Sequence, residues 1–235
     1  MLQSVVLPNS VPEAIAALSA PGSALLAGGT VLMPRVNAGD DAITTLVSLK
    51  RAGLTGVRVS AGSVEIGTAT TLAELAEADA LAFLRPALDA IASPTIRNMA
   101  TVGGNLFAKQ PYGDLGACLI ALDAQVTIKG AGGTRTQPVA QVVAAPLAAG
   151  EIATAITFSL PAPDSFRFAK AGRKALNAAA RTCSASNGRP ISARSTETAR
   201  SAWGPTPPRK RPTTSTRPTT LTPAPGIGRV LCGPV

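Results

Sequence analysis

Two turns with adjacent glycines, each carrying a polar side chain, are the residues in this sequence best suited to chemistry. The first is Gly28-Gly29-Thr30 and the second is Thr101-Val102-Gly103-Gly104-Asn105. Because glycine has no Cβ, backbone N–H groups at such turns can approach a ligand closely and form an anion-binding concavity. The Thr30 hydroxyl and the Asn105 amide add donors. Two such turns could hold the two phosphates of a dinucleotide, although a single glycine pair is more often only a tight turn.

Neither turn matches a common nucleotide-binding motif. The spacings GxGxxG and GxxxxGK[ST] are both absent, which excludes Rossmann and P-loop interpretations of these turns. A further glycine cluster, residues 130–133, lies between two strand-like segments and is interpreted as a hairpin turn. Spacing alone therefore predicts an anion-binding site without naming the anion.

The sequence offers no catalytic side chains of the usual kinds. It contains no histidine, which excludes Ser-His-Asp and Cys-His catalysis and every histidine-based metal site. Its three cysteines, Cys118, Cys183 and Cys232, are far apart and form no CxxC pair. Cys118 lies in an apolar run and is predicted to be a core residue. We therefore predict no catalytic residue and no metal ligand, and any redox chemistry would need a bound cofactor.

Helices and strands alternate irregularly around the two turns. Capping-box spacings at Ser10-Glu13 and Thr71-Glu74 predict helix starts, and Ser93-Pro94 is predicted to end a helix. Asp114 is predicted to cap the apolar helix that follows it. Strands are predicted at residues 24–27, 43–49, 57–59, 64–66, 125–129, 151–160 and 166–170. This order predicts a mixed α+β fold rather than a regular βαβ series.

The net positive charge lies almost wholly at the end of the chain. Residues 181–235 hold nine of the 22 Lys and Arg residues and one of the 13 acidic residues. They also hold nine of the 20 prolines, and they show no helix or strand periodicity. We predict a disordered basic tail. It has no aromatic residues spaced for base stacking and no nucleic-acid module, so no specific nucleic-acid partner is predicted.

Hydropathy predicts a folded domain without a membrane span. Apolar residues make up 46% of the chain, enough for a core, but no apolar run reaches the roughly 18 to 20 residues of a membrane-spanning helix. The first residues lack a basic segment followed by a long apolar one, so no secretory signal is predicted. The expected location is cytoplasmic.

The segments LLAGGTVLMPRV and IRNMATVGGNLFAKQPYGDLGACLIALDAQV resemble the FAD-binding subunit of the molybdenum hydroxylases, the family of carbon monoxide dehydrogenase and xanthine dehydrogenase. The resemblance covers roughly residues 1 to 177. It implies a two-subdomain FAD-binding fold of the PCMH/vanillyl-alcohol-oxidase type, with a truncated or aberrant C-terminal domain. The implied units are residues 1–55 and 56–172 as FAD-binding subdomains, and residues 173–180 as the start of the C-terminal domain.

The resemblance also implies the cofactor-binding residues. Those of the first turn would wrap the FAD pyrophosphate, those of the second would form a second phosphate loop, and Asp114 would bind a hydroxyl-bearing part of the cofactor. Leu147 matches a backbone contact near the flavin ring, and Lys170 matches a lysine near the flavin. The full set is Leu25, Leu26, Ala27, Gly28, Gly29, Thr30, Val31, Leu32, Thr101, Val102, Gly103, Gly104, Asn105, Asp114, Leu147 and Lys170.

In such a subunit FAD takes electrons from a small subunit with [2Fe–2S] clusters and passes them to an external acceptor. The resemblance therefore implies two protein partners, that small subunit and a large molybdopterin-binding subunit, and makes this chain an FAD-dependent oxidoreductase subunit. An alternative from another functional class stays open: the chain could be a cofactor-free, truncated remnant that acts only as a binding or assembly module.

The sequence departs from the family in two places. The family usually has an acidic residue after the first glycine turn, where this chain has Val31. From about Arg181 the helix and strand pattern of the expected C-terminal domain gives way to Arg, Pro, Ser and Thr. Such a change is typical of a shifted reading frame in a GC-rich gene, and our hypothesis is that residues from about 181 onward are out of frame.

Overall fold

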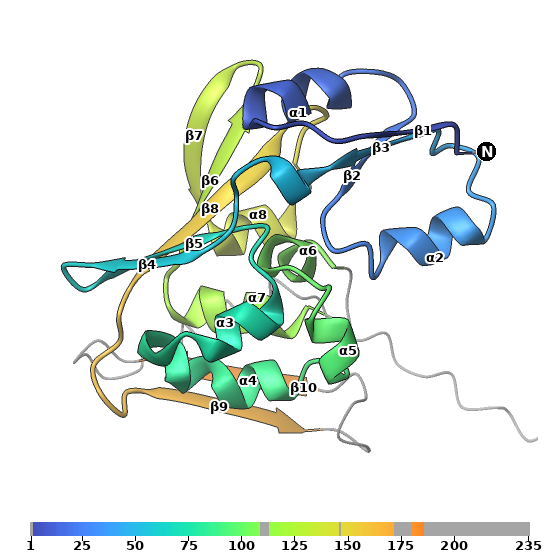
Figure 1. Ribbon diagram of the computed structural model, residues 1–235. Coiled ribbons are helices and arrows are strands. Elements are labelled where there is room, and N and C mark those ends of the chain that lie inside the picture. Colours follow the sequence, from blue (N-terminus) through green and yellow to red (C-terminus); the bar gives the residue numbers. More distant parts are fainter. Residues whose placement is uncertain (1, 109–112, 146, 172–179, 186–235) are drawn as a thin grey trace, which may run out of the picture. The chain divides into compact units, whose positions relative to one another are not determined.

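The described part of the chain folds into two main β-sheets, a smaller one of three strands and a larger one of five, and a third sheet of two strands (Figure 1). Buried apolar residues form two separate clusters, and short helices connect the strands. The computed structural model describes residues 2–108, 113–145, 147–171 and 180–185, all of which belong to one compact unit. The mixed α+β class predicted from the sequence is confirmed. Residues 173–179 of the expected C-terminal domain and residues 186–235 of the predicted tail lie outside the described residues.

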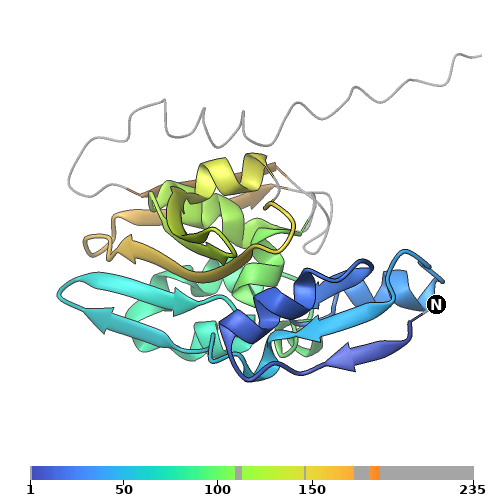
Figure 2. The same ribbon diagram turned by 90° about the horizontal axis from the view of Figure 1, so that it is seen from above.

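The smaller sheet is parallel and lies at the N-terminal end of the chain. Its strands are β1 (Ser4–Val6), β2 (Ser23–Leu26) and β3 (Thr45–Ser48), in the order β1-β3-β2. Helix α1 (Val11–Leu18) connects β1 to β2 and packs on β2 and β3 (Figure 2). Helix α2 (Leu32–Asn37) connects β2 to β3, and a 3₁₀ turn, η1 (Leu49–Arg51), follows β3. Parallel neighbours need such crossover connections.

The larger sheet is antiparallel and has the order β4-β5-β8-β6-β7. The hairpins β4–β5 and β6–β7 form its edges. The sequence predicted the first hairpin and the turn of the second at residues 130–133, but it did not predict strand β7. The strands are β4 (Val57–Ser60), β5 (Ser63–Gly67), β6 (Gln125–Gly130), β7 (Gly133–Pro138) and β8 (Ile152–Ser159).

A helical layer covers one face of this larger sheet and is bordered by the separate antiparallel pair of β9 (Phe166–Ala171) and β10 (Ala180–Ala185) (Figure 1). The layer and its surroundings contain α3 (Leu72–Glu77), η2 (Asp79–Leu84), α4 (Arg85–Asp89), α5 (Pro94–Arg97), α6 (Val102–Leu106), α7 (Asp114–Ala121) and α8 (Val139–Ala144). Fully buried leucines and isoleucines from these helices and from β5, β6 and β8 form the larger core. Burial of this kind stabilises a fold by about 25 cal/mol per Å² of apolar surface.

Local capping explains where α1 and α3 begin. The predicted capping box at Thr71 is complete, because Thr71 Oγ1 accepts from Glu74 N–H while Glu74 Oε2 accepts from Thr71 N–H. At Ser10 the box is half formed: Ser10 Oγ accepts from Glu13 N–H, but the Glu13 carboxylate accepts from Asn9 N–H instead. Both predicted helix starts are confirmed.

Three local predictions were wrong in detail. Ser93-Pro94 does not only end a helix, because Ser93 Oγ accepts from Ile96 N–H and so caps the new helix α5. Asp114 is the first residue of α7, and the residue in the capping position is Gly113. The second glycine turn is not an open loop, because its glycines lie in the first turn of α6.

The tail predicted to be disordered from residue 181 onward was given too early a start, because residues 181–185 form a strand. Residues 181–185 pair with β9 in an antiparallel ladder as part of β10. The backbone groups of an open strand edge need hydrogen-bond partners, and β10 supplies them to β9.

Among the residues that the structure describes, no helix is long and apolar enough to cross a membrane.

The β4–β5 turn contains a strained alanine. Ala61 and Gly62 both have left-handed backbones, with φ of 48° and 78°, as a type I′ hairpin turn requires. Asparagine tolerates this region better than alanine. We expect Ala61→Asn to raise the free energy of unfolding by about 0.5–1 kcal/mol, measured by urea denaturation.

The matched control is Ala131→Asn in the β6–β7 turn, where the alanine precedes glycine in the same way but has no positive φ. Equal effects of the two substitutions would contradict the assignment of strain to Ala61.

Candidate functional site

The first glycine turn lies at the carboxyl end of a parallel strand. Leu25 and Leu26 end β2, residues 27–31 form the turn, and Leu32 begins α2. The backbone N–H groups of residues 28–31 donate to no acceptor within the described part of the chain. The turn is half-exposed, and Gly29 has a φ of 72° that favours glycine. Unused N–H groups at the carboxyl end of a parallel strand are the usual setting for an anion.

Gly28 brings this turn against the segment that leads into the second one. A Cβ built at Gly28 would lie 1.9 Å from Met99 O, 2.8 Å from Met99 C and 3.0 Å from Ala100 Cα. Only a residue without a side chain allows this approach. The two glycine turns, about 70 residues apart in the sequence, are therefore neighbours in the fold.

The N–H groups of the second turn are used within the protein. Val102 N–H donates to Thr70 O and Gly103 N–H donates to Thr68 O, each at 2.8 Å. Gly104 N–H donates to Thr101 Oγ1 at 3.0 Å, which caps α6. The two turns therefore differ: the first has donors to offer an anion, while the second is fixed to the strand end before α3.

The two glycines of the second turn have different roles. A Cβ at Gly103 would lie 2.9 Å from Thr68 Cβ and 3.0 Å from Thr68 O, so this glycine permits close packing inside the protein. Gly104 is exposed, and within the described residues a Cβ there would meet only Thr101 Oγ1, at 3.0 Å. Gly104 thus presents a side-chain-free surface to the exterior, where a ligand could approach closely.

The remaining polar residues of the predicted set form one connected network. Asn105 Oδ1 accepts from Leu115 N–H at 3.1 Å, which joins α6 to the start of α7. Asp114 Oδ2 accepts from Lys170 Nζ at 3.0 Å, and Lys170 Nζ also donates to Ala90 O at 2.9 Å. The Asp114 and Lys170 side chains are only 4% and 11% exposed. Desolvation by this burial lowers the pKa of the Lys170 ammonium, while the adjacent carboxylate favours its charged form.

Leu147 lies apart from this network. It follows α8 and packs against the larger core. Its neighbour Ala148 donates its N–H to Glu151 Oε2 at 3.0 Å, and Arg135 pairs with Glu151 at 2.8 Å. The Arg135 guanidinium holds the pKa of the Glu151 carboxyl below its usual value. Within the described residues, no hydrogen bond connects Leu147 to the other predicted site residues.

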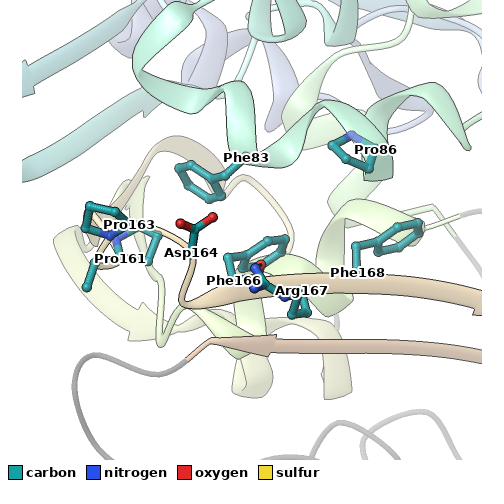
Figure 3. Close-up of a pocket in the computed structure, with 9 residues that line it drawn as sticks. Phe83, Pro86, Pro161, Pro163, Asp164, Phe166, Arg167 and Phe168 are labelled. Atoms are coloured by element: carbon teal, nitrogen blue, oxygen red, sulfur yellow. Dashed lines mark hydrogen bonds between the residues drawn. The ribbon is translucent and has the colours of Figure 1, made fainter.

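A separate pocket of about 380 Å³ lies between α4 and β9 (Figure 3). Phe83 and Pro86 form one wall, and residues 166–168 line the opposite wall along β9. The rings of Phe83 and Phe166 meet edge to face, with centroids 5.2 Å apart. None of the residues predicted to bind a cofactor lines this pocket.

Three residues of the candidate site were not predicted from the sequence. Met99 supplies the carbonyl against Gly28, Thr68 supplies the carbonyl against Gly103, and Arg97 anchors the segment between α4 and α6. Arg97 and Met99 lie inside the motif that carries the family resemblance, which is the signal that could have found them. Within the described residues, no group of three or more potential metal ligands is present.

Unused N–H donors at the end of a parallel strand, close to the segment that leads into a second glycine turn, define a domain suited to a phosphate-bearing nucleotide. The model of the FAD-binding domain in molybdopterin dehydrogenases matches residues 2–162. The chain therefore belongs to this family, whose cofactor is FAD, and the resemblance seen in the sequence is confirmed.

Named relatives agree with this membership. The chain is 35% identical to the carbon monoxide dehydrogenase medium chain of Hydrogenophaga pseudoflava, over 56% of this chain and 48% of that protein. It is 34% identical to the xanthine dehydrogenase FAD-binding subunit of Escherichia coli O157:H7, over 51% of this chain and 43% of that protein. The chain thus spans about half the length of the curated relatives it matches.

The fold agrees as well. The structure of carbon monoxide dehydrogenase from Hydrogenophaga pseudoflava lacking the Mo-pyranopterin moiety superposes with a TM-score of 0.70 at 27% identity. The match covers 76% of this chain and 67% of that chain. Mixed helix and sheet in this arrangement is therefore the fold of a known oxidoreductase subunit.

The residues present fit FAD. The N–H groups of residues 28–31 offer donors to a pyrophosphate, and Gly104, in the second turn, leaves room for a ligand at its own surface. Val31, where the family usually has an acid, is 55% exposed, so this departure leaves no unfilled space in the core.

Proposed function

We propose that this chain is the FAD-binding electron-transfer subunit of a molybdenum hydroxylase, with the two-subdomain fold of the PCMH/vanillyl-alcohol-oxidase type. The observation that carries the proposal is the contact of Gly28 with Met99, which places the free N–H groups of the first turn beside the second turn. Residues 1–55 and 56–172 are the proposed subdomains, and the site lies where they meet.

The protein's own residues bind and orient the cofactor. The N–H groups of residues 28–31 donate to the pyrophosphate, and Thr30 adds its hydroxyl. The exposed face of Gly104 lets the cofactor lie close to α6. Asp114 and Lys170 form the far side of the site, where the carboxylate accepts from cofactor hydroxyls. Leu147 is the proposed backbone contact near the flavin ring.

Bound FAD supplies the redox chemistry, taking up electrons and passing them to an acceptor such as NAD⁺, a quinone or oxygen. No acid, base or nucleophile of this chain is needed for that transfer. The proposed partners are a small subunit with [2Fe–2S] clusters as electron donor and a large molybdopterin subunit where substrate is hydroxylated. The medium-chain name of the carbon monoxide dehydrogenase relative supports this assembly.

The flavin content of the purified chain tests the proposal. We expect a yellow protein whose flavin absorbance persists through gel filtration, or which regains it after incubation with FAD. A folded but colourless chain that does not take up FAD would contradict the proposal and favour the cofactor-free binding or assembly module.

Gly104→Val tests the site itself. Its side chain would extend into the space outside α6, while valine is at least as favourable as glycine in a helix. We expect FAD affinity to fall by about tenfold or more, with unchanged far-ultraviolet circular dichroism. The matched control is Gly132→Val in the β6–β7 turn, where no atom lies within 4 Å of a Cβ and φ is not positive. Equal FAD affinity in the two variants would count against a ligand at Gly104.

A further inference from the structure

The end of α4 presents a row of backbone carbonyls, residues 89–92, that accept from two cationic side chains. We refer to it as the carbonyl turn. Arg97 Nη1 donates to Ile91 O and to Ala92 O at 3.0 Å each, and to Asp89 O at 3.4 Å. Lys170 Nζ donates to the remaining carbonyl, Ala90 O, at 2.9 Å. Carbonyls at a helix end have no partner within the helix, so cations there are stabilising.

Arg97 connects the carbonyl turn to the N-terminal side of the second glycine turn. It ends α5, and Ala100 N–H donates back to Ile96 O at 2.7 Å. Ala100 O in turn accepts from Leu72 N–H at 2.9 Å. This segment carries the Met99 carbonyl that meets Gly28, so the position of Arg97 sets the surface against which the first turn rests.

Lys170 connects the same carbonyl turn to the other side of α6. Its ammonium pairs with Asp114 at the start of α7, and Leu115 N–H donates to Asn105 at the end of the glycine turn. The segments before and after residues 101–105 are thus both connected by hydrogen bonds to the end of α4, through Arg97 and Lys170 respectively.

We propose that Arg97 is a positioning residue for FAD: by binding the carbonyl turn it holds the second glycine turn in the place that the cofactor requires. Arg97 does not contact the cofactor in this proposal, which rests on the proposed function. Its side chain is only 15% exposed, and its Nη1 donates to the Ile91 and Ala92 carbonyls while its Nη2 lies 3.7 Å from Asp89 Oδ1. A lysine at this position has a single nitrogen and cannot reach the carbonyls and the Asp89 carboxylate from two separate atoms.

The test compares Arg97→Met and Arg97→Lys with the wild-type chain. FAD dissociation constants are measured by flavin fluorescence at a temperature where each apo-protein is fully folded, so that lost stability alone leaves them unchanged. We expect affinity to fall about tenfold in Arg97→Met, with Arg97→Lys between it and the wild type.

The control is Arg85→Met, which removes a guanidinium that donates to Ala76 O at 2.8 Å and to Asp79 at 3.1 Å, away from the glycine turns. It is expected to keep wild-type affinity. Unchanged affinity in Arg97→Met, or an equal loss in Arg85→Met, would overturn the proposal.

Hydrogen exchange of the apo-protein provides a readout without FAD. Faster exchange of the Gly104 and Asn105 amides is expected in Arg97→Met but not in Arg85→Met, and equal exchange in the two variants would overturn the proposal. If the wild-type chain itself binds no FAD, the proposed function fails, and this exchange measurement still tests the coupling of Arg97 to α6.

Discussion

Replacing Gly28 by alanine is expected to separate the two glycine turns and to weaken FAD binding strongly. The new Cβ would lie 1.9 Å from the Met99 carbonyl oxygen, and its three nearest atoms all belong to backbone. No side-chain rotation can relieve such an overlap. Gly28 does not have a positive φ, so the effect of alanine comes from this contact and not from backbone strain.

The first turn must give way, because the segment around Met99 is held by several hydrogen bonds. Leu72 N–H donates to Ala100 O, and Val102 N–H donates to Thr70 O. We expect Gly28→Ala to cost about 1–3 kcal/mol of stability, the usual penalty for overpacking. FAD affinity is expected to fall by about a hundredfold, because the pyrophosphate donors lose their position beside Gly104.

Fluorescence titration with FAD and urea denaturation measure the two effects separately. Gly132→Ala is the matched control, because no atom lies within 4 Å of its Cβ. A folded Gly28→Ala protein that binds FAD as tightly as the wild type would show that contact between the turns is not part of the site.

Local features of this fold could be predicted from the sequence because their causes are local. The cap at Thr71 depends on a glutamate three residues later, and the β6–β7 turn depends on adjacent glycines. The tail starting at 181 was misjudged because the pairing of β10 depends on the open edge of β9, which composition does not reveal.

The geometry of the site depends on contacts between distant segments. Nothing in the spacing of two glycine pairs says that Gly28 meets Met99, and only the family resemblance placed them together. The N–H groups of the second turn appeared available in the sequence, yet carbonyls of Thr68 and Thr70 accept from them. The sequence therefore predicted residues of the candidate site, but it did not show which of their backbone N–H groups are already hydrogen-bonded within the protein.

The pairing of Asp114 with Lys170 is another such contact, since 56 residues separate them. We expect Lys170→Met to lower the free energy of unfolding by about 3–5 kcal/mol, because it leaves the Asp114 carboxylate buried without its cation. Asp114→Asn is expected to be similarly destabilising, because the ammonium then lies buried beside a neutral amide.

The double variant, Asp114→Asn with Lys170→Met, removes both charges. Replacing both members of a buried ion pair costs much less than removing one. We therefore expect the double variant to be more stable than either single variant, with a coupling energy of at least about 1 kcal/mol in urea denaturation. Additive losses would show that the pair does not act as a unit in the folded protein.

FAD affinity of the same variants separates the structural role of the pair from its role toward the cofactor. If the Asp114 carboxylate accepts from cofactor hydroxyls, the double variant regains stability while its FAD affinity stays low. Recovery of both properties together would instead assign Asp114 and Lys170 to the architecture alone. In that case the residues that contact the cofactor would have to come from the glycine turns, where Gly104 leaves room for a ligand and Gly28 packs against the Met99 carbonyl.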